Sequence, residues 1–287
     1  MHVMTQFVKM HGLGNDFVIL DARGNADLRV GPPAARAIAD RRHGIGCDQI
    51  LILRDAAEAD FFMEVLNSDG SKAQACGNGT RCVAAMVMRD SKLETLQIAT
   101  DGGMLRAWYD EDGLVSVDMG PVKMGWQEVP LAREMDTSNV ELAAAPALAV
   151  CHSMGNPHAV VFVDDVDAVD LEQIGPAIEH DDLFPERVNL SIVHRQEDGL
   201  FRMRVWERGA GITLACGSGA CAVGVAIARR GLGGRVNRIV MDGGLITIDW
   251  QDDGSVGGRV IMTGPVAYAY HGEMEGALAQ ALGNTDG

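Results

Sequence analysis

The 287-residue sequence predicts an α+β protein made of two pseudo-symmetric domains, each a mixed β-sheet rolled around one central helix. Three observations predict this fold. A cysteine motif occurs twice, at Cys76-Gly77-Asn78-Gly79 and at Cys216-Gly217-Ser218-Gly219. Further matches recur at a nearly constant spacing, and short apolar strands surround two helices that are apolar nearly all round.

The spaced matches indicate an internal duplication. Gly14-Asn15 matches Gly155-Asn156, Gln49-Ile50 matches Asn189-Leu190, Val65-Leu66-Asn67 matches Val205-Trp206-Glu207, and Gly120-Pro121-Val122 matches Gly264-Pro265-Val266. Any one match is noise, but several in order indicate two copies of a whole fold unit. We therefore expect an N-terminal domain over residues 1–121, completed by residues 266–281, and a C-terminal domain over residues 122–265.

The secondary structure is predicted from apolar runs and turn residues. The strands expected in the first half include Phe7–Met10, Phe17–Asp21, Ile50–Leu53 and Phe61–Leu66. Pro33–Arg42 is predicted to be a helix, because its basic last turn suits a helix C-terminus. The helices that follow the two cysteines, Cys82–Met88 and Ala220–Ala228, lack a polar face and must be buried on every side.

Composition limits the class of partner and the compartment. A net charge of −16 argues against nucleic acid or an anionic membrane as a partner. The six cysteines form no disulfide-like framework, and the first residues lack the features of a signal peptide, so we expect a cytoplasmic protein. A long uncharged run, residues 210–228, is interrupted by glycines and is predicted to be a loop and a buried helix rather than a membrane span.

Each motif cysteine is placed to begin a helix, where free backbone N–H groups and the helix dipole stabilise a thiolate. The dipole contributes up to ~2 kcal/mol in partly buried sites, and one pKa unit is about 1.4 kcal/mol. The helix end is therefore expected to lower the thiol pKa by about one unit, whereas burial acts in the opposite direction.

Two such thiols facing one cavity would not both ionise, because like charges raise one of the two pKa values. One thiolate and one thiol supply a base and an acid on opposite sides of one carbon, which is the chemistry that inverts a stereocentre. The backbone N–H groups of Gly77, Asn78, Gly217 and Ser218 would then hold an anionic group on that carbon, such as an amino acid carboxylate.

The remaining cysteines are expected to be small buried hydrophobic residues. They are Cys47, Cys82, Cys151 and Cys221. The spacing from each motif cysteine to the next is not typical of zinc sites, and the second cysteine lies in an apolar helix, so no metal is expected.

The motifs together resemble those of the diaminopimelate epimerase family. The segments that carry the resemblance are Lys9–Phe17, Arg42–Gly46, Asn67–Gly70, Cys76–Gly79, Met154–His158, Phe184–Asn189, Glu207–Gly211 and Ala215–Gly219. They occur in the family's order and run from about residue 7 to residue 224. The resemblance implies two pseudo-symmetric domains with the active site in the cleft between them.

The resemblance also implies the reaction, which interconverts LL- and meso-diaminopimelate in lysine and cell-wall precursor synthesis, without pyridoxal phosphate or metal. It implies that Cys76 is the proton donor and Cys216 the proton acceptor for the LL-substrate. His158 and Glu207 match positions that tune the thiols. Family members are usually dimers, and Tyr270 lies near the position of the dimer contact.

The substrate-binding positions follow residue by residue from the same resemblance. They are Asn15, Gln49, Asn67, Asn156, Asn189, Glu207 and Arg208, with Gly77, Asn78, Gly217 and Ser218 as the backbone cradle. Two positions depart from the family pattern. Ile212 replaces the second glutamate of Glu-Arg-Gly-Ala-Gly-Glu-Thr, and Cys47, for which no catalytic role is expected, stands where alanine is common.

Other interpretations remain open from the residues alone. One is a racemase of another amino acid on the same fold, such as a proline or histidine racemase. Asn67, Asn156, Asn189 and Arg208 speak against it, because together they suit the distal end of a longer amino acid. Another is a non-catalytic amino-acid-binding protein or an isomerase that uses no thiols, and the presence of both motif cysteines argues against each of these.

Overall fold

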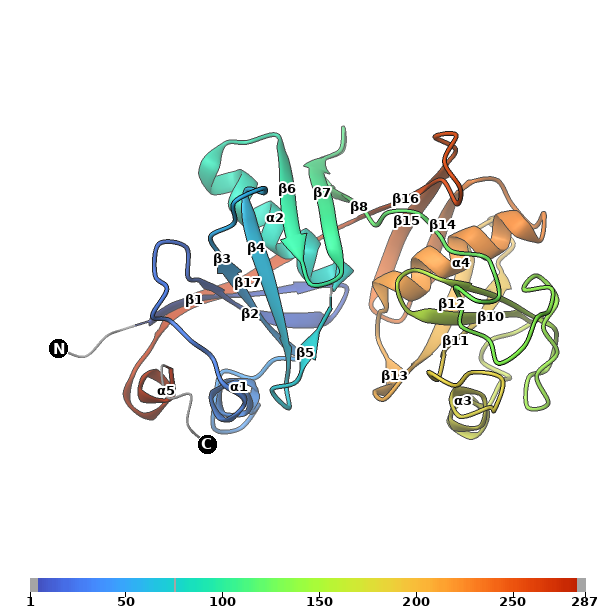
Figure 1. Ribbon diagram of the computed structural model, residues 1–287, viewed down its shortest axis with the longest axis horizontal. Coiled ribbons are helices and arrows are strands. Elements are labelled where there is room, and N and C mark those ends of the chain that lie inside the picture. Colours follow the sequence, from blue (N-terminus) through green and yellow to red (C-terminus); the bar gives the residue numbers. More distant parts are fainter. Residues whose placement is uncertain (1–4, 75, 283–287) are drawn as a thin grey trace. The chain divides into compact units, whose positions relative to one another are not determined.

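A computed structural model describes residues 5–74 and 76–282, so Ala75 of the first motif lies outside the described residues. The chain divides into two compact units (Figure 1). Unit 1 comprises Met1–Val117 with Pro265–Gly287, and unit 2 comprises Asp118–Gly264. The breaks predicted from the sequence follow residues 121 and 265.

Unit 1 contains three helices and most of its strands lie in one sheet. The helices are α1 (Pro32–Ala39), α2 (Gly77–Ser91) and α5 (Gly276–Ala281). The strands are β1 (Thr5–Gly12), β2 (Asn15–Asp21), β3 (Gln49–Arg54), β4 (Phe61–Asn67), β5 (Lys72–Ala73), β6 (Thr95–Thr100), β7 (Gly103–Tyr109) and β17 (Ala267–Met274), while β8 (Val115–Asp118) reaches the boundary with unit 2.

Unit 2 repeats this order of elements. Its helices are α3 (Leu171–Glu179) and α4 (Gly217–Arg229). Its strands are β9 (Ala149–Ser153), β10 (Pro157–Phe162), β11 (Asn189–Arg195), β12 (Phe201–Glu207), β13 (Gly211–Thr213), β14 (Val236–Met241), β15 (Gly244–Gln251) and β16 (Arg259–Gly264).

Five strands of each unit pair in the same pattern, which mixes parallel and antiparallel neighbours. In unit 1, β2 pairs parallel with β3, β3 antiparallel with β4, β4 parallel with β6, and β6 antiparallel with β7. In unit 2 the same pattern joins β10, β11, β12, β14 and β15. The predicted α+β fold with an internal duplication is therefore confirmed.

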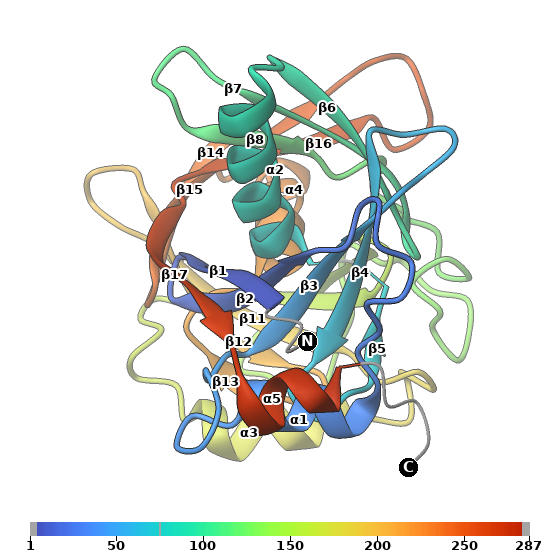
Figure 2. The ribbon, with the colours of Figure 1, turned by 90° about the vertical axis from the view of Figure 1, so that its left-hand side faces the viewer.

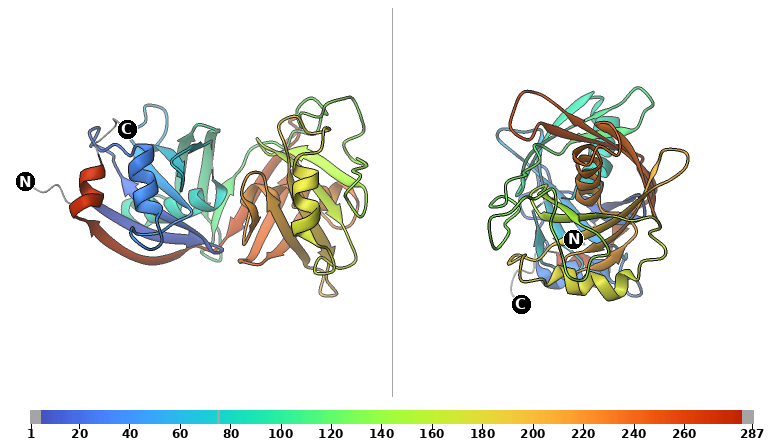
Figure 3. Two further views of the ribbon diagram at one scale, coloured as in Figure 1. Left: turned by 90° about the horizontal axis from the view of Figure 1, so that it is seen from below. Right: turned by 90° about the vertical axis from the view of Figure 1, so that its right-hand side faces the viewer.

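Each sheet encloses an apolar helix. Every residue of α2 from Gly77 to Met88 is buried, and α4 is buried from Gly219 to Ile227. Strands β1, β2, β6 and β7 contact α2, and β9, β10, β11, β14, β15 and β16 contact α4. Helices without a polar face can be stable in water only when neighbouring strands cover them on all sides, as the strands around α2 and α4 do (Figures 1 and 3).

A second helix covers the outer face of each sheet. Val18 and Leu20 of β2, together with Ile50 and Ile52 of β3, form an apolar cluster with Ile38 of α1. The alternate residues Phe17 and Ile19 are also buried, so the strands are apolar on both faces because helices cover both. In unit 2, residues of β9, β10 and β11 pack in the same way with Leu171 and Ile178 of α3.

The end of α1 differs from the sequence-based prediction. The helix ends at Ala39 rather than at Arg42, and the backbone of Asp40 is already extended. The Asp40 carboxylate accepts the backbone N–H groups of Arg42 and His43, which stabilises a turn in place of another helical turn. This end releases Arg41 from the helix, and its guanidinium pairs elsewhere.

The C-terminal strand β17 pairs antiparallel with β1 and so belongs to unit 1 (Figure 3, left). Helix α5 follows it and lies against α1 (Figure 2). Tyr270 on β17 is half exposed, and its ring makes an edge contact with Phe7 at a centroid distance of 6.0 Å. None of the helices in the described part of the chain has the length and apolar character needed to span a membrane.

Candidate functional site

Cys76 is the N-cap of α2, with an extended backbone. Its Sγ accepts the backbone N–H of Gly79 at 3.4 Å, so the thiol caps the helix as the motif predicts. Only glycine fits at position 79, because a Cβ there would lie 2.9 Å from Cδ1 of Leu51. The close packing of α2 on β3 thus accounts for the second glycine of the motif.

Asn15 and Asn78 lie beside this thiol. The Cys76 thiol lies 3.8 Å from Oδ1 of Asn15, and Nδ2 of Asn78 lies 3.5 Å from the same oxygen. The other end of each amide binds a side chain that can only accept, or only donate, a hydrogen bond. Asp48, which can only accept, binds Nδ2 of Asn15 at 2.9 Å, and Arg81, which can only donate, binds Oδ1 of Asn78 at 3.0 Å. The carbonyl oxygen of Asn15 is therefore the atom directed at Cys76.

A network of charged side chains lies next to Asn15. Asp16 binds the buried Lys9 at 2.6 Å and Arg41 at 2.7 Å, and Arg41 also binds Asp48. Burial acts to raise the pKa of Asp16, but hydrogen bonds from Arg41 and Lys9 outweigh it and hold the pKa far below its usual range. Asp16 is therefore ionised at neutral pH, and its ion pairs with Lys9 and Arg41 hold the chain next to Asn15 and Asp48.

Gln49 and Asn67 lie at the same edge of the sheet, where β3 begins and β4 ends. They face each other in the strand register, and Nε2 of Gln49 donates to Oδ1 of Asn67 at 2.9 Å. Asn67 in turn donates to Oγ of Ser71. Because β2 runs parallel to β3, Asn15 at the start of β2 belongs to this edge as well.

Cys216 occupies the equivalent N-cap of α4, but its surroundings differ from those of Cys76. It is 5% exposed, and its Sγ lies 3.6 Å from Oγ of Ser218. Burial raises the pKa of this thiol well above its ordinary value, and the charge and hydrogen bond of Glu207 raise it further. The N–H of Gly219 and the hydroxyl of Ser218 act in the opposite direction without prevailing, so burial outweighs the expected lowering by the helix end.

Glu207 is the last residue of β12 and is held by its own turn. Its carboxylate accepts the hydroxyl of Thr213 on β13, the strand paired with β12. Ile212, which replaces the family's second glutamate, lies between them in sequence with a side chain that is 38% exposed. Its departure from the family pattern thus adds apolar surface and leaves the Glu207–Thr213 hydrogen bond in place.

His158 on β10 is fully buried and joins a hydrogen-bonded chain toward Cys216. Its Nε2 lies 3.0 Å from Oδ1 of Asn156, and Nδ2 of Asn156 lies 3.4 Å from Oγ of Ser218. Burial, together with the charges of His152 and Arg208, lowers the pKa of His158 to about 3. The imidazole is therefore neutral at pH 7 and acts in this chain as a hydrogen-bonding group rather than a cation.

Both ends of the Asn189 side-chain amide form hydrogen bonds with backbone groups. Its Nδ2 donates to the carbonyl of Pro157 at 2.9 Å, and its Oδ1 accepts the N–H of Arg208 at 3.0 Å. The Arg208 guanidinium donates to the carbonyl of Glu186. Unit 2 therefore brings Cys216, Ser218, Asn156 and His158 together in one hydrogen-bonded chain, and Asn189 and Arg208 in a second group.

Sequence reasoning missed one residue of this region, Glu179. Its carboxylate is buried and accepts Nε1 of Trp206 at 2.7 Å and the N–H of Gly209 at 2.9 Å. A glutamate in a predicted helix is ordinarily assigned to the surface. The available signal was its spacing, because Glu179 follows Leu171 and Gly175 at intervals of four residues on the buried face of α3.

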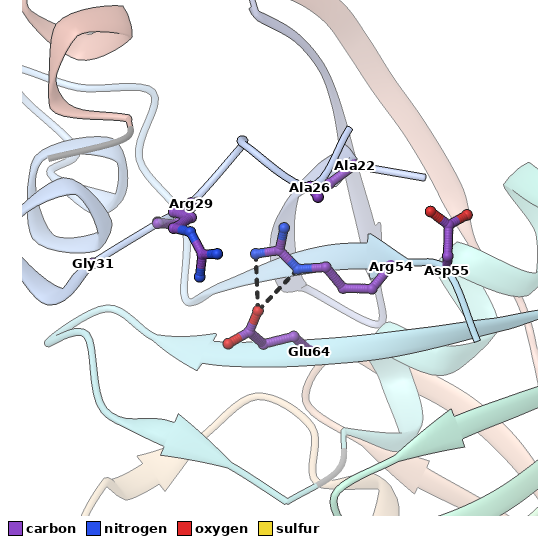
Figure 4. A pocket seen from close by; sticks show the side chains of 8 residues that line it. Ala22, Ala26, Arg29, Gly31, Arg54, Asp55 and Glu64 are labelled. Carbon is purple, nitrogen blue, oxygen red and sulfur yellow. Dashed lines mark hydrogen bonds and ion pairs between the residues drawn. The ribbon is translucent and has the colours of Figure 1, made fainter. Parts of the chain in front are cut away.

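A cavity in unit 1 is not part of these groups. It has a volume of about 460 Å³ and lies in unit 1, between the 22–31 loop and the ends of β3 and β4 (Figure 4). Arg54 and Glu64 line it and pair with each other. They lie toward the opposite strand ends from Gln49 and Asn67, so the cavity is separate from the predicted binding residues. Within residues 5–74 and 76–282, no cluster of three His, Cys, Asp or Glu side chains is arranged to hold a metal ion.

Comparison with known proteins agrees with the motifs. The family model described as Diaminopimelate epimerase matches residues 7–125 and 150–269. A Rhodospirillum centenum (strain ATCC 51521 / SW) protein named diaminopimelate epimerase is 52% identical over 279 residues, covering 96% of this chain and 94% of its own. A protein of the same name from Acidiphilium cryptum (strain JF-5) is 50% identical over 274 residues, covering 95% and 97%.

More distant solved structures share the fold. A phenazine biosynthesis protein of the PhzF family from Bacillus anthracis superposes with a TM-score of 0.66 at 16% identity, covering 94% of this chain and 99% of its own. A hydroxyproline epimerase from Agrobacterium vitis gives a TM-score of 0.66 at 15% identity, covering 94% and 91%. The family model and the close relatives span nearly the whole chain and include both cysteine motifs. The chain therefore belongs to the diaminopimelate epimerase family.

Proposed function

We propose that this protein interconverts LL-2,6-diaminopimelate and meso-diaminopimelate without a cofactor, in lysine and peptidoglycan precursor synthesis. The observation that carries the proposal is the repeated position of Cys76 and Cys216, each the N-cap of the buried helix of a duplicated unit. Relatives that are about half identical over nearly the full length, and that bear the name of this activity, support the choice of substrate.

The proposed reaction moves two protons. The Cys216 thiolate removes the α-hydrogen of the LL-substrate, so that a C–H bond breaks and an S–H bond forms. The electron pair left on the α-carbon is delocalised into the carboxylate, whose growing charge is stabilised by the N–H groups of Gly77, Asn78, Gly217 and Ser218. Cys76 then delivers its proton to the opposite face of the carbon and is left as the thiolate.

The resting protonation states needed for this direction have separate local supports. At Cys76, Oδ1 of Asn15 lies 3.8 Å from the sulfur and can accept a hydrogen bond from the S–H group of the proposed proton donor. At Cys216, burial favours the thiol, so a base must take its proton before the reaction. Glu207 bonds to this thiol and is the proposed base, and His158 is proposed to tune the site as a neutral ring.

Seven side chains, including Asn15 and Glu207, are also proposed to hold the substrate, chiefly its distal amino acid group. They are Asn15, Gln49, Asn67, Asn156, Asn189, Glu207 and Arg208. Amide oxygens and a carboxylate suit an ammonium group, and amide N–H groups with a guanidinium suit a carboxylate. We further propose a cytoplasmic homodimer with Tyr270 at its contact, supported by the exposed position of that ring on β17.

The proposal is tested by incubating the reduced protein with LL-diaminopimelate in deuterated water, with no added cofactor. We expect meso-diaminopimelate to accumulate with deuterium at the inverted α-carbon, measured by chiral chromatography and mass spectrometry. Inversion without deuterium incorporation would contradict a two-thiol proton exchange. Inversion of proline or hydroxyproline in place of diaminopimelate would favour an amino acid racemase of the same fold.

Substitution of either thiol should abolish epimerisation. Cys76→Ser and Cys216→Ser are each expected to lower kcat at least about 100-fold, because a hydroxyl is a far weaker acid and base than a thiol near neutral pH. Cys47→Ala is the matched control. Cys47 is buried in the apolar cluster of unit 1, burial raises its pKa to about 11, and the variant should keep wild-type activity. Full activity of either serine variant would refute the pairing.

A further inference from the structure

Glu179 is a buried carboxylate with no part in the proton transfers described above. It is the last residue of α3 and is 3% exposed. One of its oxygens accepts the indole N–H of Trp206, and the other accepts the backbone N–H of Gly209. The guanidinium of Arg187 lies 3.6 Å from the second oxygen and supplies a nearby positive charge.

The two donors flank the turn that carries Glu207 and Arg208. Trp206 precedes these residues on β12, and Gly209 follows them with a positive φ of 76°. Arg208 is held at two further points, because its N–H binds Asn189 and its guanidinium binds the carbonyl of Glu186. Glu179 thus closes a set of contacts that fixes the backbone on both sides of Arg208.

The ring of Trp206 packs closely against α3. A Cβ on Gly175 would lie 2.4 Å from Cδ2 of the indole, so the ring rests directly on the backbone of α3. Gly211 lies on the other side of the turn. A Cβ built at this position would be 3.6 Å from Cη2 of the indole. The indole N–H is thereby aimed at Glu179, one helical turn after Gly175.

A carboxylate is the side chain that this geometry requires. Both partners are N–H donors, and each binds a different oxygen of the same group. A glutamine has only one oxygen, so its NH2 group would face either the indole N–H or the Gly209 N–H. The donor facing that group would lose its partner on the buried Glu179 side chain, and the turn would have to move to satisfy it.

We propose that Glu179 is a positioning residue that holds Arg208 in the orientation in which it binds the distal carboxylate of the substrate. The inference rests on the proposed function. It requires that the loss of the Glu179 contacts weakens substrate binding through Arg208 and leaves the thiol chemistry largely intact.

The test is a double-mutant cycle with Glu179→Gln and Arg208→Lys, using diaminopimelate epimerisation as the assay. In the wild-type background, Glu179→Gln should raise KM about tenfold or more and change kcat less than about threefold, because one buried hydrogen bond to a charged group is lost. In the Arg208→Lys background the same substitution should change KM less than about twofold, since residues that act through one another are not additive.

Two controls separate positioning from general stability. Glu172→Gln removes an exposed glutamate from the first turn of the same helix and should leave KM unchanged. Trp206→Phe keeps an aromatic ring on Gly175 and retains the Gly209 contact, so it should raise KM less than Glu179→Gln does. If Glu179→Gln does not fold, Trp206→Phe takes its place in the cycle with Arg208→Lys.

The outcomes are distinct. A wild-type protein without activity toward diaminopimelate would overturn the proposed function. An active wild type with an unchanged KM in Glu179→Gln would overturn the inference alone. Equal effects of Glu179→Gln in the wild-type and Arg208→Lys backgrounds would show that Glu179 does not act through Arg208, and would also overturn it.

Discussion

The two cysteines differ in what surrounds them rather than in their backbone position. Both are helix N-caps with extended backbones, φ being −142° at Cys76 and −123° at Cys216. Cys76 is partly exposed beside an amide oxygen, whereas Cys216 is buried beside a carboxylate. The two helix ends therefore share one geometry but have different neighbouring side chains, and we base the proposed donor and acceptor roles on those neighbours.

At the residue scale, a buried histidine of unit 2 predicts a dependence of stability on pH. The Nε2–H of His152 donates to the carbonyl of Ala222 at 2.7 Å, and burial lowers the pKa of His152 to about 3. In the unfolded chain His152 is protonated below pH 6.5, whereas in the folded protein it stays neutral down to about pH 3. The stability contributed by this neutral ring is therefore present above pH 6.5 and is lost as the pH falls.

His152→Gln isolates this contribution, because an amide can replace the hydrogen bond but does not titrate. Between pH 7 and pH 5 the wild type should lose about 2 kcal/mol more unfolding free energy than the variant. Urea unfolding followed by tryptophan fluorescence measures this, since Trp126, Trp206 and Trp250 all lie in unit 2. Parallel pH profiles of the two proteins would contradict the prediction.

At the element scale, the central helices show how packing decides residue size. Gly224 of α4 lies so close to β15 that a Cβ would be 2.5 Å from Cγ2 of Ile248. The position 140 residues earlier, in α2, is Ala84, which is fully buried without difficulty. The glycine is therefore required by the neighbouring strand and not by the helix itself.

Gly224→Ala should accordingly destabilise the protein despite the better helix propensity of alanine. Propensity favours alanine by about 1 kcal/mol, whereas overpacking a close core contact costs ~1–3 kcal/mol. We expect a net loss of about 1 kcal/mol, measured by urea unfolding. Gly234→Ala, where a new Cβ would meet no atom within 4 Å, is the control and should leave stability within about 0.5 kcal/mol of wild type.

At the scale of the whole molecule, the first copy of the duplicated unit is completed by a strand that follows the second copy. Strand β17 follows the end of the second copy, yet it pairs with β1 of unit 1 over Thr5 to His11. The first unit thus depends on the last part of the chain, because β1 pairs with β2 along one edge and with β17 along the other.

Truncation after Gly264 should therefore weaken unit 1 and spare unit 2. The change removes β17 and α5, which exposes the outer edge of β1 and the face of α1 that contacts α5. Hydrogen exchange should show lost protection of the β1 amides that pair with β17, and retained protection in β11 and β12. Equal loss of protection in both units would show that they unfold as one.

Much of this organisation could be predicted without coordinates. The repeated motif, the constant spacing and the all-round apolar helices predict a duplicated α+β fold because each reflects local chemistry: a turn, a cap or a face that must be buried. The candidate cysteines could be predicted for the same reason, because the residues next to a helix N-cap indicate its position.

Only the tertiary structure decided the rest. Asp40 ends α1 before Arg41 because its side chain caps a turn, and Arg41 then pairs with Asp16 and Asp48, which no local pattern predicts. Glu179 meets Trp206 and Gly209 from a separate helix. The sequence by itself determined the scaffold and the thiols, whereas the pKa of Cys216 and the placement of Arg208 depend on contacts between residues far apart in the chain, and burial gives those contacts their strength.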